Sequence, residues 1–195
     1  GIDFSLEDDY YGDTRFHIPF IAWYQVMNAS LALTTMEVLK DRIPVTMEQL
    51  QAGIANTRWQ GRMETILPGV IVDGAHNEDG VRRFVETAER FQKEYPLTLL
   101  FSAVNDKDYQ DMIHTICSRI KFRKVVTTEV GGYREVPSAE LAEIFCKEGC
   151  KDVGNSDNIE EAFHMAHEAK GEDGMLFCVG SLYLVGEIKT LLLKK

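Results

Sequence analysis

Three side chains suited to polar chemistry lie close together in the stretch "IVDGAHNEDG", residues 71 to 80. Asp73 offers a carboxylate, His76 an imidazole and Asn77 an amide. The stretch stands between an apolar run and a helical pattern, so Asn77 or Asp79 can cap a helix whose free backbone N–H groups favour an anion. These residue types in this order indicate a site for a polar, negatively charged ligand.

A purely structural interpretation of the same stretch is also open. Asp, Gly and Asn are common in any turn from a strand to a helix, so Asp73 and Asn77 can be turn and cap residues and His76 a hydrogen-bonded loop histidine. The pattern is not GxGxxG and does not predict a dinucleotide site. A metal hydrolase using Asp73 and His76 is disfavoured, because no third ligand follows at metal-site spacing.

The cysteines do not form a metal-binding pattern. No two of them make a CxxC pair, and Cys117 and Cys178 lie in apolar sequence typical of buried free thiols. Other soft ligands occur as two pairs that could each share a helix face: Cys146 with Cys150, and His164 with His167. The close ligand pairs of structural zinc sites are missing, so we expect reduced thiols and no metal site.

Composition and charge narrow the class of protein. Of the 195 residues, 45% are hydrophobic and 27% are charged, which suits one good core or one domain plus part of another. The formal net charge of -10 argues against a nucleic-acid partner, which needs Lys and Arg massed on one face. No apolar stretch approaches the roughly 20 residues that span a bilayer, and no leader opens the chain, so we expect a cytoplasmic protein that does not bind membranes.

The chain has two parts that differ in their pattern of apolar residues, and the change falls at about residues 56 to 61. These parts must position the side chains described above. The first part, residues 1 to 56, opens with polar and aromatic sequence that has short extended stretches. An amphipathic helix is predicted over residues 28 to 42 by four apolar positions: Leu31, Leu33, Met36 and Leu39. Thr46 is expected to cap a second helix, but this part has too little apolar sequence to form a core alone.

The second part, residues 57 to 195, alternates apolar runs with helical patterns. The expected strands, each followed by its helix, are 69–75 and 78–94, 97–104 and 109–120, 124–130 and 138–149, 152–153 and 158–171, and 174–180 and 182–195. Continuous apolar strands separated by helices predict an α/β fold with a doubly wound, mostly parallel sheet covered on both faces. Such sheets bind ligands at the carboxyl ends of their strands, and Asp73 is expected to end the first strand.

The neighbours of the opening stretch add a more specific signal. "RWQGRMETILPGVIVDGAHNEDG" carries Gly61, Arg62 and Glu64 just before the Asp-Gly-Ala-His-Asn run, and "CVGSLYLVGEI" follows near the end of the chain. Together these motifs resemble the carboxyl-terminal domain of the folylpolyglutamate synthetase and dihydrofolate synthetase family, within the Mur-type amide ligases. In this resemblance, residues 1 to 56 correspond to the end of a central ATPase domain, and residues 57 to 195 to a glutamate-binding domain.

The resemblance implies an ATP-dependent amide ligase. Such enzymes activate the carboxylate of dihydropteroate or a reduced folate as an acyl phosphate, which the amine of L-glutamate then attacks, and most of the catalysis is placement and electrostatics. ATP and Mg²⁺ are the implied cofactors, and a monomer is expected. The sequence leaves open whether the parent enzyme is a dihydrofolate synthase, a folylpolyglutamate synthase or both.

The resemblance implies that three residues bind the nucleotide, because they occupy matching positions in the family's motifs. Asn28 of "QVMNASLAL" resembles the asparagine near the adenine, and Arg62 of "GRME" resembles the arginine that reaches the ATP phosphates. A guanidinium suits that role because its planar fork meets two phosphate oxygens at once. Asp73 resembles the aspartate that contacts the nucleotide at its ribose.

The amino-acid substrate would be held by three other residues. His76 would lie beside the glutamate and the acyl phosphate as a hydrogen-bond donor or orienting group. Lys107 of "NDKDYQDM" and Ser181 of "GSLYL" resemble positions that hold the carboxylates of the glutamate. Their alternative interpretations are a solvated loop lysine and a helix N-cap serine. Trp59 is expected to pack at the domain junction.

The sequence departs from the family in two respects. It has no GxxxxGK[ST] phosphate loop, so the chain alone is expected to lack turnover and the Mg²⁺ ligands are expected in a preceding ATPase domain. Where the family shows Gly-x-His-Gln, this chain has Ala22 and Tyr24, which removes the family histidine but keeps Gln25. The alternative hypothesis is a non-catalytic module that binds a nucleotide or an acidic metabolite. Arg62 argues against that module, because such a binder has no reason to project an arginine toward a cleft.

Overall fold

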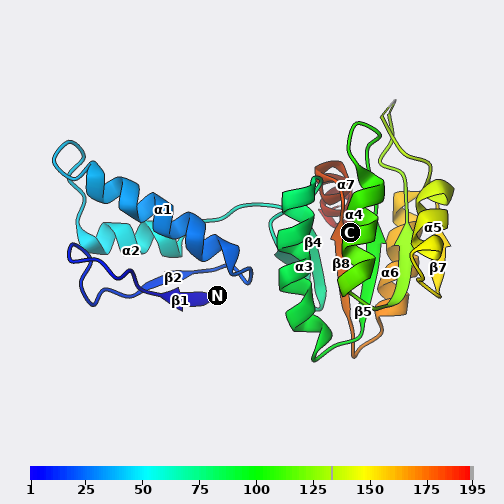
Figure 1. Cartoon of the computed structure of the whole chain (residues 1–195), viewed down its shortest axis with the longest axis horizontal. Helices are drawn as coiled ribbons and strands as arrows, with labels where there is room; N and C mark the ends of the chain where they lie inside the picture. Colours follow the sequence, from blue (N-terminus) through cyan, green and yellow to red (C-terminus); the bar gives the residue numbers. More distant parts are fainter. Residues whose placement is uncertain (133, 194–195) are drawn as a thin grey trace. The chain divides into compact units, whose positions relative to one another are not determined.

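The computed structural model describes residues 1–132 and 134–193, which divide into two compact units (Figure 1). Unit 1 is Gly1–Gln60 and unit 2 is Gly61–Lys195. The boundary between the units follows Gln60 rather than residue 56. It lies within residues 56 to 61, where the pattern of apolar residues changes. None of the helices among the described residues is long and apolar enough to cross a membrane.

Unit 1 consists of one two-stranded sheet and two helices. Its elements are β1 (Ile2–Phe4), β2 (Phe16–Ile18), α1 (Tyr24–Val38) and α2 (Met47–Ala55), with β1 and β2 antiparallel. Thr46 caps α2 as predicted, and forms a capping box with Gln49 in which each side chain accepts the backbone N–H of the other residue. The core is small: Tyr11, Phe16, Leu33 and Leu50.

The predicted apolar face of α1 was only partly right. The helix starts at Tyr24, before the predicted residue 28, and ends at Val38. Leu33 is buried, but Leu31 is 70% exposed on another face of the helix. Apolar residues occur around most of α1, so their spacing alone could not select the face that packs against the sheet.

Unit 2 is built on one six-stranded sheet. Its elements are β3 (Glu64–Leu67), β4 (Val70–Asp73), α3 (Glu78–Gln92), β5 (Leu97–Phe101), α4 (Tyr109–Arg119), β6 (Phe122–Thr127), α5 (Ser138–Lys147), β7 (Val153–Asn155), α6 (Ile159–Lys170), β8 (Met175–Val179) and α7 (Leu182–Leu193). The strand order is β3-β4-β8-β5-β6-β7, and every neighbouring pair except β3 with β4 is parallel. The prediction of a doubly wound, mostly parallel sheet is confirmed.

One strand was missed by the sequence analysis. β3 pairs antiparallel with β4 through a tight turn in which Gly69 has a positive φ of 71°, so β4 is the second strand of the unit and not the first. The sequence "ETIL" of β3 is half-buried and lacks the continuous apolar run that identifies the central strands. An edge strand with one exposed side gives a weaker sequence signal than a strand buried on both faces.

Helices cover both faces of the sheet (Figure 1). On one face Phe84 of α3 packs edge-on against Phe177 of β8, and Phe145 of α5 against Phe101 of β5, with ring centroids 5.4 and 5.3 Å apart. On the opposite face α6 and α7 bury a cluster that includes Leu100, Val126, Leu176, Cys178 and Ile188. Alternate residues of each strand therefore point to opposite layers.

The strand order decides which loops meet. The connection from β4 through α3 to β5 passes over the position taken by β8, so the carboxyl ends of β4, β8 and β5 are neighbours. The segment after β6 joins them, because Asn105 donates its backbone N–H to the carbonyl of Arg134 at 2.8 Å. Ligands of α/β sheets bind at such an edge.

Candidate functional site

Asp73, at the end of β4, is buried and connects two loops through hydrogen bonds. It is 4% exposed, and its Oδ1 and Oδ2 accept the backbone N–H groups of Ala75 and Met63 at 2.7 and 2.8 Å. Burial raises the pKa of the Asp73 carboxyl to about 6, against the opposing effects of these hydrogen bonds and the nearby Arg62 and His76. Asp73 therefore has the turn role that the sequence analysis offered as the structural interpretation. Its contact with a ribose stays a prediction.

The turn that carries Arg62 is held by the residues around it. The N–H of Gly61 donates to Glu64 Oε2 at 2.7 Å, and the carbonyl of Gly61 accepts the N–H of Gly74 at 2.7 Å. Met63 is the one non-glycine residue with a positive φ, 45°, in the part of the chain that the structure describes. A left-handed residue at this turn stores strain, and the bond from its N–H to Asp73 helps to hold it.

Arg62 itself lies against the loop that follows β4. A Cβ added at Gly74 would stand 2.8 Å from Arg62 Nη1, so the absence of a side chain there lets the guanidinium approach the loop. The side chain of Glu64 is engaged by Lys189 at 2.7 Å, whereas Arg62 is only half-buried. Within "GRME", Arg62 is therefore the residue able to meet a ligand.

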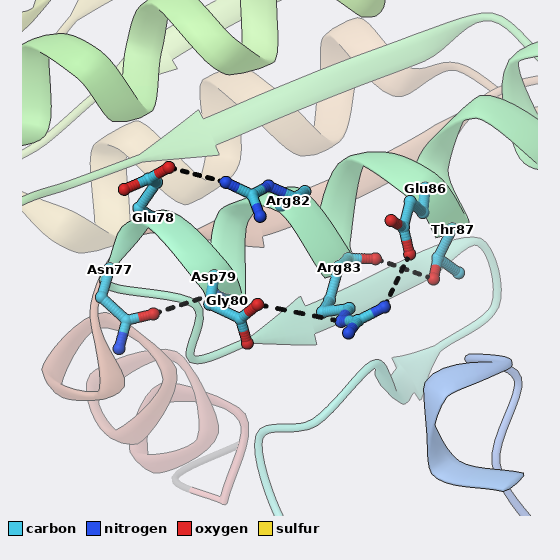
Figure 2. Close-up of polar contacts among 8 residues, drawn as sticks. All are labelled: Asn77, Glu78, Asp79, Gly80, Arg82, Arg83, Glu86 and Thr87. Atoms are coloured by element: carbon cyan, nitrogen blue, oxygen red, sulfur yellow. Dashed lines mark hydrogen bonds and ion pairs between the residues drawn. The ribbon is translucent and has the colours of Figure 1, made fainter. Parts of the chain in front are cut away.

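Of the two residues expected to cap α3, Asn77 and Asp79, the structure shows which one does so (Figure 2). Asn77 is the N-cap, and its Oδ1 accepts the N–H of Gly80 at 2.8 Å. Asp79 lies in the first turn, 4.0 Å from Arg83, next to Glu78. Two carboxylates already supply the negative charge that this helix N-terminus favours, so a ligand anion is less suited to it than the sequence suggested.

His76 occupies the loop between β4 and α3 in a defined orientation. Its Nδ1 lies 2.8 Å from the carbonyl oxygen of Gly74, which can only accept, so the proton is assigned to Nδ1. The Nε2 atom lies on the other side of the ring, away from this bond. His76 also lines a cavity of about 400 Å³ at the carboxyl edge of the sheet.

That cavity brings together three of the residues selected from the sequence. His76, Lys107 and Ser181 all line it, and they follow β4, β5 and β8, respectively. The Oγ of Ser181 accepts the N–H of Tyr183 at 3.1 Å, so Ser181 caps α7 while it contributes to the wall. Lys107 is half-buried and makes no ion pair with the residues that the structure describes.

Three further polar residues of this cavity were missed by the sequence analysis. Arg134 donates from Nη1 to Asp106 at 3.1 Å and from Nη2 to the hydroxyl of Tyr183 at 3.0 Å. The signal that could have found Arg134 is its place in the loop after the run "KVVTTEV", which ends at the same sheet edge. We use the name carboxyl-edge cavity for this pocket.

Unit 1 has a smaller cavity of its own, which contains the predicted Asn28. It measures about 160 Å³ and is lined by Ile18, Phe20, Gln25, Asn28, Ala29, Ala32, Ile54, Thr57 and Trp59. Asn28 Nδ2 donates to Gln25 Oε1 at 2.8 Å, which fixes two amides in a mostly apolar wall. Trp59 keeps 62% of its surface exposed, and its packing at a domain junction stays a prediction.

The burial and the pairing of the cysteines agree only in part with the sequence predictions. Cys178 is fully buried in the core as predicted. Cys146 and Cys150 do not share a helix face, because α5 ends at Lys147 and the chain turns at Gly149, with a φ of 94°. Cys150 instead lies 3.6 Å from Cys117, sulfur to sulfur. No group of three His, Cys, Asp or Glu residues in 1–132 and 134–193 is arranged to hold a metal ion.

Comparisons with known proteins show the family to which the chain is related. Residues 61–182 match the family described as Mur ligase, glutamate ligase domain. The chain is 30% identical over 194 residues to the dihydrofolate synthase/folylpolyglutamate synthase of Bacillus subtilis, covering 95% of this chain and 43% of that protein. It is 28% identical over 175 residues to a probable bifunctional folylpolyglutamate synthase/dihydropteroate synthase of Haloferax volcanii, covering 89% of this chain and 20% of that protein.

Solved structures give the same relationship. The folylpolyglutamate synthase of Mycobacterium tuberculosis, solved with ADP and AMPPCP, is 26% identical and matches with a TM-score of 0.76, covering 91% of this chain and 42% of that one. The Escherichia coli enzyme with ADP has the same fold at 18% identity, with a TM-score of 0.80, covering 92% of this chain and 41% of that one. The chain thus spans less than half the length of the relatives named here.

Proposed function

The chain belongs to the Mur ligase family, glutamate ligase domain, and on that premise we propose that it is part of an ATP-dependent amide ligase. The ligase would add L-glutamate to dihydropteroate or a reduced folate through an acyl phosphate. Relatives that it matches along most of its length are named dihydrofolate and folylpolyglutamate synthases. A cytoplasmic monomer is part of the same proposal.

The carboxyl-edge cavity is the observation that carries the proposal. Its walls combine a cation, Lys107, with a helix start capped by Ser181, and both favour a carboxylate. His76 lines the same space, and its Nδ1 is engaged by the carbonyl of Gly74. These groups suit an amino acid held by its carboxylates, with its amine free to attack.

Three residues are proposed to bind the nucleotide: Asn28, Arg62 and Asp73. The small, mostly apolar cavity around Asn28 and Gln25 suits a purine ring, which needs apolar contact on its faces and amides at its edge. The half-buried Arg62 suits phosphate oxygens. Asp73 has the weaker support, because both of its oxygens already accept backbone hydrogen bonds.

The residues of this chain would act by placement rather than by covalent chemistry. ATP would supply the phosphoryl group that activates the folate carboxylate. Arg62 would offset negative charge on the phosphates, and His76 and Lys107 would orient the glutamate for attack. Mg²⁺ would offset phosphate charge when bound, and its ligands are proposed to lie mainly in the ATPase domain of the complete protein.

The test is glutamate-dependent ADP release by the complete protein, including the region that precedes these residues in its relatives. We expect Arg62→Ala to lower turnover at least about 100-fold, the usual cost of removing a group that stabilises transition-state charge. Arg83→Ala is the matched control, because Arg83 is on α3 and its guanidinium lies 4.0 Å from Asp79 and 3.4 Å from Glu86 on the same helix. If the complete protein releases no ADP when glutamate is present, the alternative of a binding module is favoured. If both variants turn over equally, the role of Arg62 is wrong.

A further inference from the structure

Arg134 is held at the carboxyl-edge cavity by residues from two other loops. Asp106, after β5, accepts its Nη1 donor, and the hydroxyl of Tyr183, at the start of α7, accepts its Nη2 donor. The backbone of Arg134 is fixed as well, since its carbonyl accepts the N–H of Asn105. Two hydrogen bonds therefore orient the guanidinium, and a third fixes the backbone that carries it.

The charges in this cavity match one class of ligand. Lys107 and Arg134 are cations, and Asp106 is an anion, so the charged side chains sum to one net positive charge. A dicarboxylic amino acid carries two carboxylates and one ammonium, which sum to one net negative charge. A single cation would bind a monocarboxylic amino acid equally well, whereas two cations on different loops favour a ligand with two carboxylates.

We propose that Arg134 is a specificity residue that binds one carboxylate of the amino-acid substrate while Lys107 binds the other. Asp106 and Tyr183 are positioning residues that aim the guanidinium, which has five N–H donors and can hold several acceptors at once. This inference rests on the proposed function, because it concerns the substrate of the same site. It adds the reason that the cavity selects a dicarboxylic amino acid.

The test is steady-state kinetics of the complete protein with L-glutamate and two analogues. L-Glutamine lacks the charge of the side-chain carboxylate, and 4-aminobutyrate lacks the α-carboxylate. We expect Arg134→Gln to raise KM for L-glutamate by roughly 10- to 100-fold, the range for a lost charge-assisted hydrogen bond, with a smaller change in kcat. For the analogue that lacks the carboxylate bound by Arg134, the substitution should change kcat/KM little.

Controls separate this inference from the proposed function. Arg83→Gln removes a surface guanidinium of α3 and should leave KM unchanged, and Tyr183→Phe should raise KM less than Arg134→Gln does. If the unsubstituted protein does not use L-glutamate, the proposed function fails and this inference fails with it. If it uses L-glutamate and Arg134→Gln has the same KM, or loses the same factor with all three compounds, only the role of Arg134 is wrong.

A second site, independent of the ligase proposal, is the thiol pair of Cys117 and Cys150. Cys117 is on α4 and Cys150 follows α5, and their sulfur atoms are 3.6 Å apart. Both side chains are half-buried rather than sealed in the core. The hydrogen bond from Cys117 lowers the pKa of the Cys150 thiol, which favours the thiolate that reacts with oxidants.

We propose that Cys117 and Cys150 form a reversible disulfide on exposure to a peroxide. The thiolate of Cys150 attacks the peroxide, giving a sulfenic acid and one water. The thiol of Cys117 then displaces the hydroxyl as a second water, so two thiols and hydrogen peroxide give one disulfide and two waters. The new bond would tie the end of α4 to the segment after α5.

Peptide mapping of the peroxide-treated chain under non-reducing conditions tests this directly. We expect a linked pair of peptides containing Cys117 and Cys150, a raised Tm of the oxidised chain, and reversal of both by dithiothreitol. Cys146→Ser, which removes an exposed cysteine, should leave the link intact, and Cys117→Ser should abolish it. A chain that instead accumulates over-oxidised Cys150 with Cys117 unmodified, or that links either residue to Cys146, would overturn the proposal.

Discussion

Unit 1 and unit 2 differ in how completely each buries its apolar residues. The large apolar side chains exposed on unit 1 are Trp23, Met27, Leu31, Val38, Ile43 and Trp59, from a unit of 60 residues. The described part of unit 2, more than twice as long, exposes Tyr95, Leu182, Tyr183 and Leu193. Two of these, Leu182 and Tyr183, line the carboxyl-edge cavity.

The difference shows that well-formed local structure does not require a closed core. α2 has a complete capping box and β1 pairs with β2 in register, yet α1 keeps an exposed row of Met27, Leu31 and Val38. In unit 2 both faces of the sheet are covered by helices, and the central strands are buried. Unit 2 is therefore expected to set the stability of the chain, and unit 1 to gain from further contacts.

The largest effect is expected from adding one methyl group at a glycine of unit 2. Gly180 has a φ of 108°, and a Cβ there would stand 2.0 Å from the carbonyl oxygen of Ser102. Gly180→Ala should lower the free energy of unfolding by about 3–5 kcal/mol, from backbone strain and overpacking together. Urea unfolding of the chain measures it.

The matched substitution in unit 1 is Gly53→Ala. Gly53 lies within α2 with nothing within 4 Å of an added Cβ, so the change should raise the helical stability of unit 1 by up to about 1 kcal/mol. Equal losses of stability from Gly180→Ala and Gly53→Ala would contradict the view that unit 2 is the tightly packed unit.

A smaller effect is expected from pH, and it should be confined to unit 2. The pKa of Asp73 is raised by burial to about 6 from its ordinary 3.8, so the folded state binds a proton more tightly than the unfolded state does. Its contribution to stability is present below pH 4 and is lost as the pH rises through 6. Relative to Asp73→Asn, which does not titrate, the unfolding free energy should fall by about 2 kcal/mol from pH 4 to pH 7.

Unit 1 provides the comparison for that measurement. No carboxyl group of unit 1, all of whose residues are described, is buried. Hydrogen exchange at pH 4.5 and pH 7, corrected for the intrinsic rate, should therefore show lost protection around β4 with little change in α2. A pH response of the same size in both units would show that burial of Asp73 is not its source.

The smallest effect on stability is expected on the exposed row of α1. Met27→Gln and Leu31→Gln should each change the unfolding free energy by less than about 0.5 kcal/mol, because both side chains are already largely in water. They should lower self-association, which sedimentation velocity at several concentrations measures. Leu33→Gln, on the buried face of the same helix, is the control and should destabilise unit 1 strongly.

Periodicity predicted the sheet of unit 2 well because its central strands are apolar on both faces. "MLFCV" became β8 within one residue of the expected bounds at each end, and "LTLLF" became β5, which starts at the expected residue and ends three residues earlier. Edge strands carry less of that signal, which is why β3 was missed. The buried face of α1 could not be read from spacing, since Leu31 and Leu33 are the same residue type and only packing distinguishes them.

Part of the candidate site was also available from the sequence. His76, Lys107 and Ser181 were selected by motif, and they line one cavity because the order β4-β8-β5 brings their loops together. Arg134 was missed because its place depends on the backbone pairing between the loops after β5 and β6, which no local pattern encodes. The double hydrogen bond of Asp73 with Met63 and Ala75 likewise requires the three-dimensional fold.

The position of β8 has a consequence for the order in which the sheet can be completed during synthesis. β8 is the last strand along the chain, yet it lies between β4 and β5. Until residues 175–179 have left the ribosome, β3-β4 and β5-β6-β7 are two separate ribbons with open apolar edges. A nascent chain that stalls before this strand would expose both edges, and completing the strand closes them and aligns the carboxyl-edge cavity in the same step.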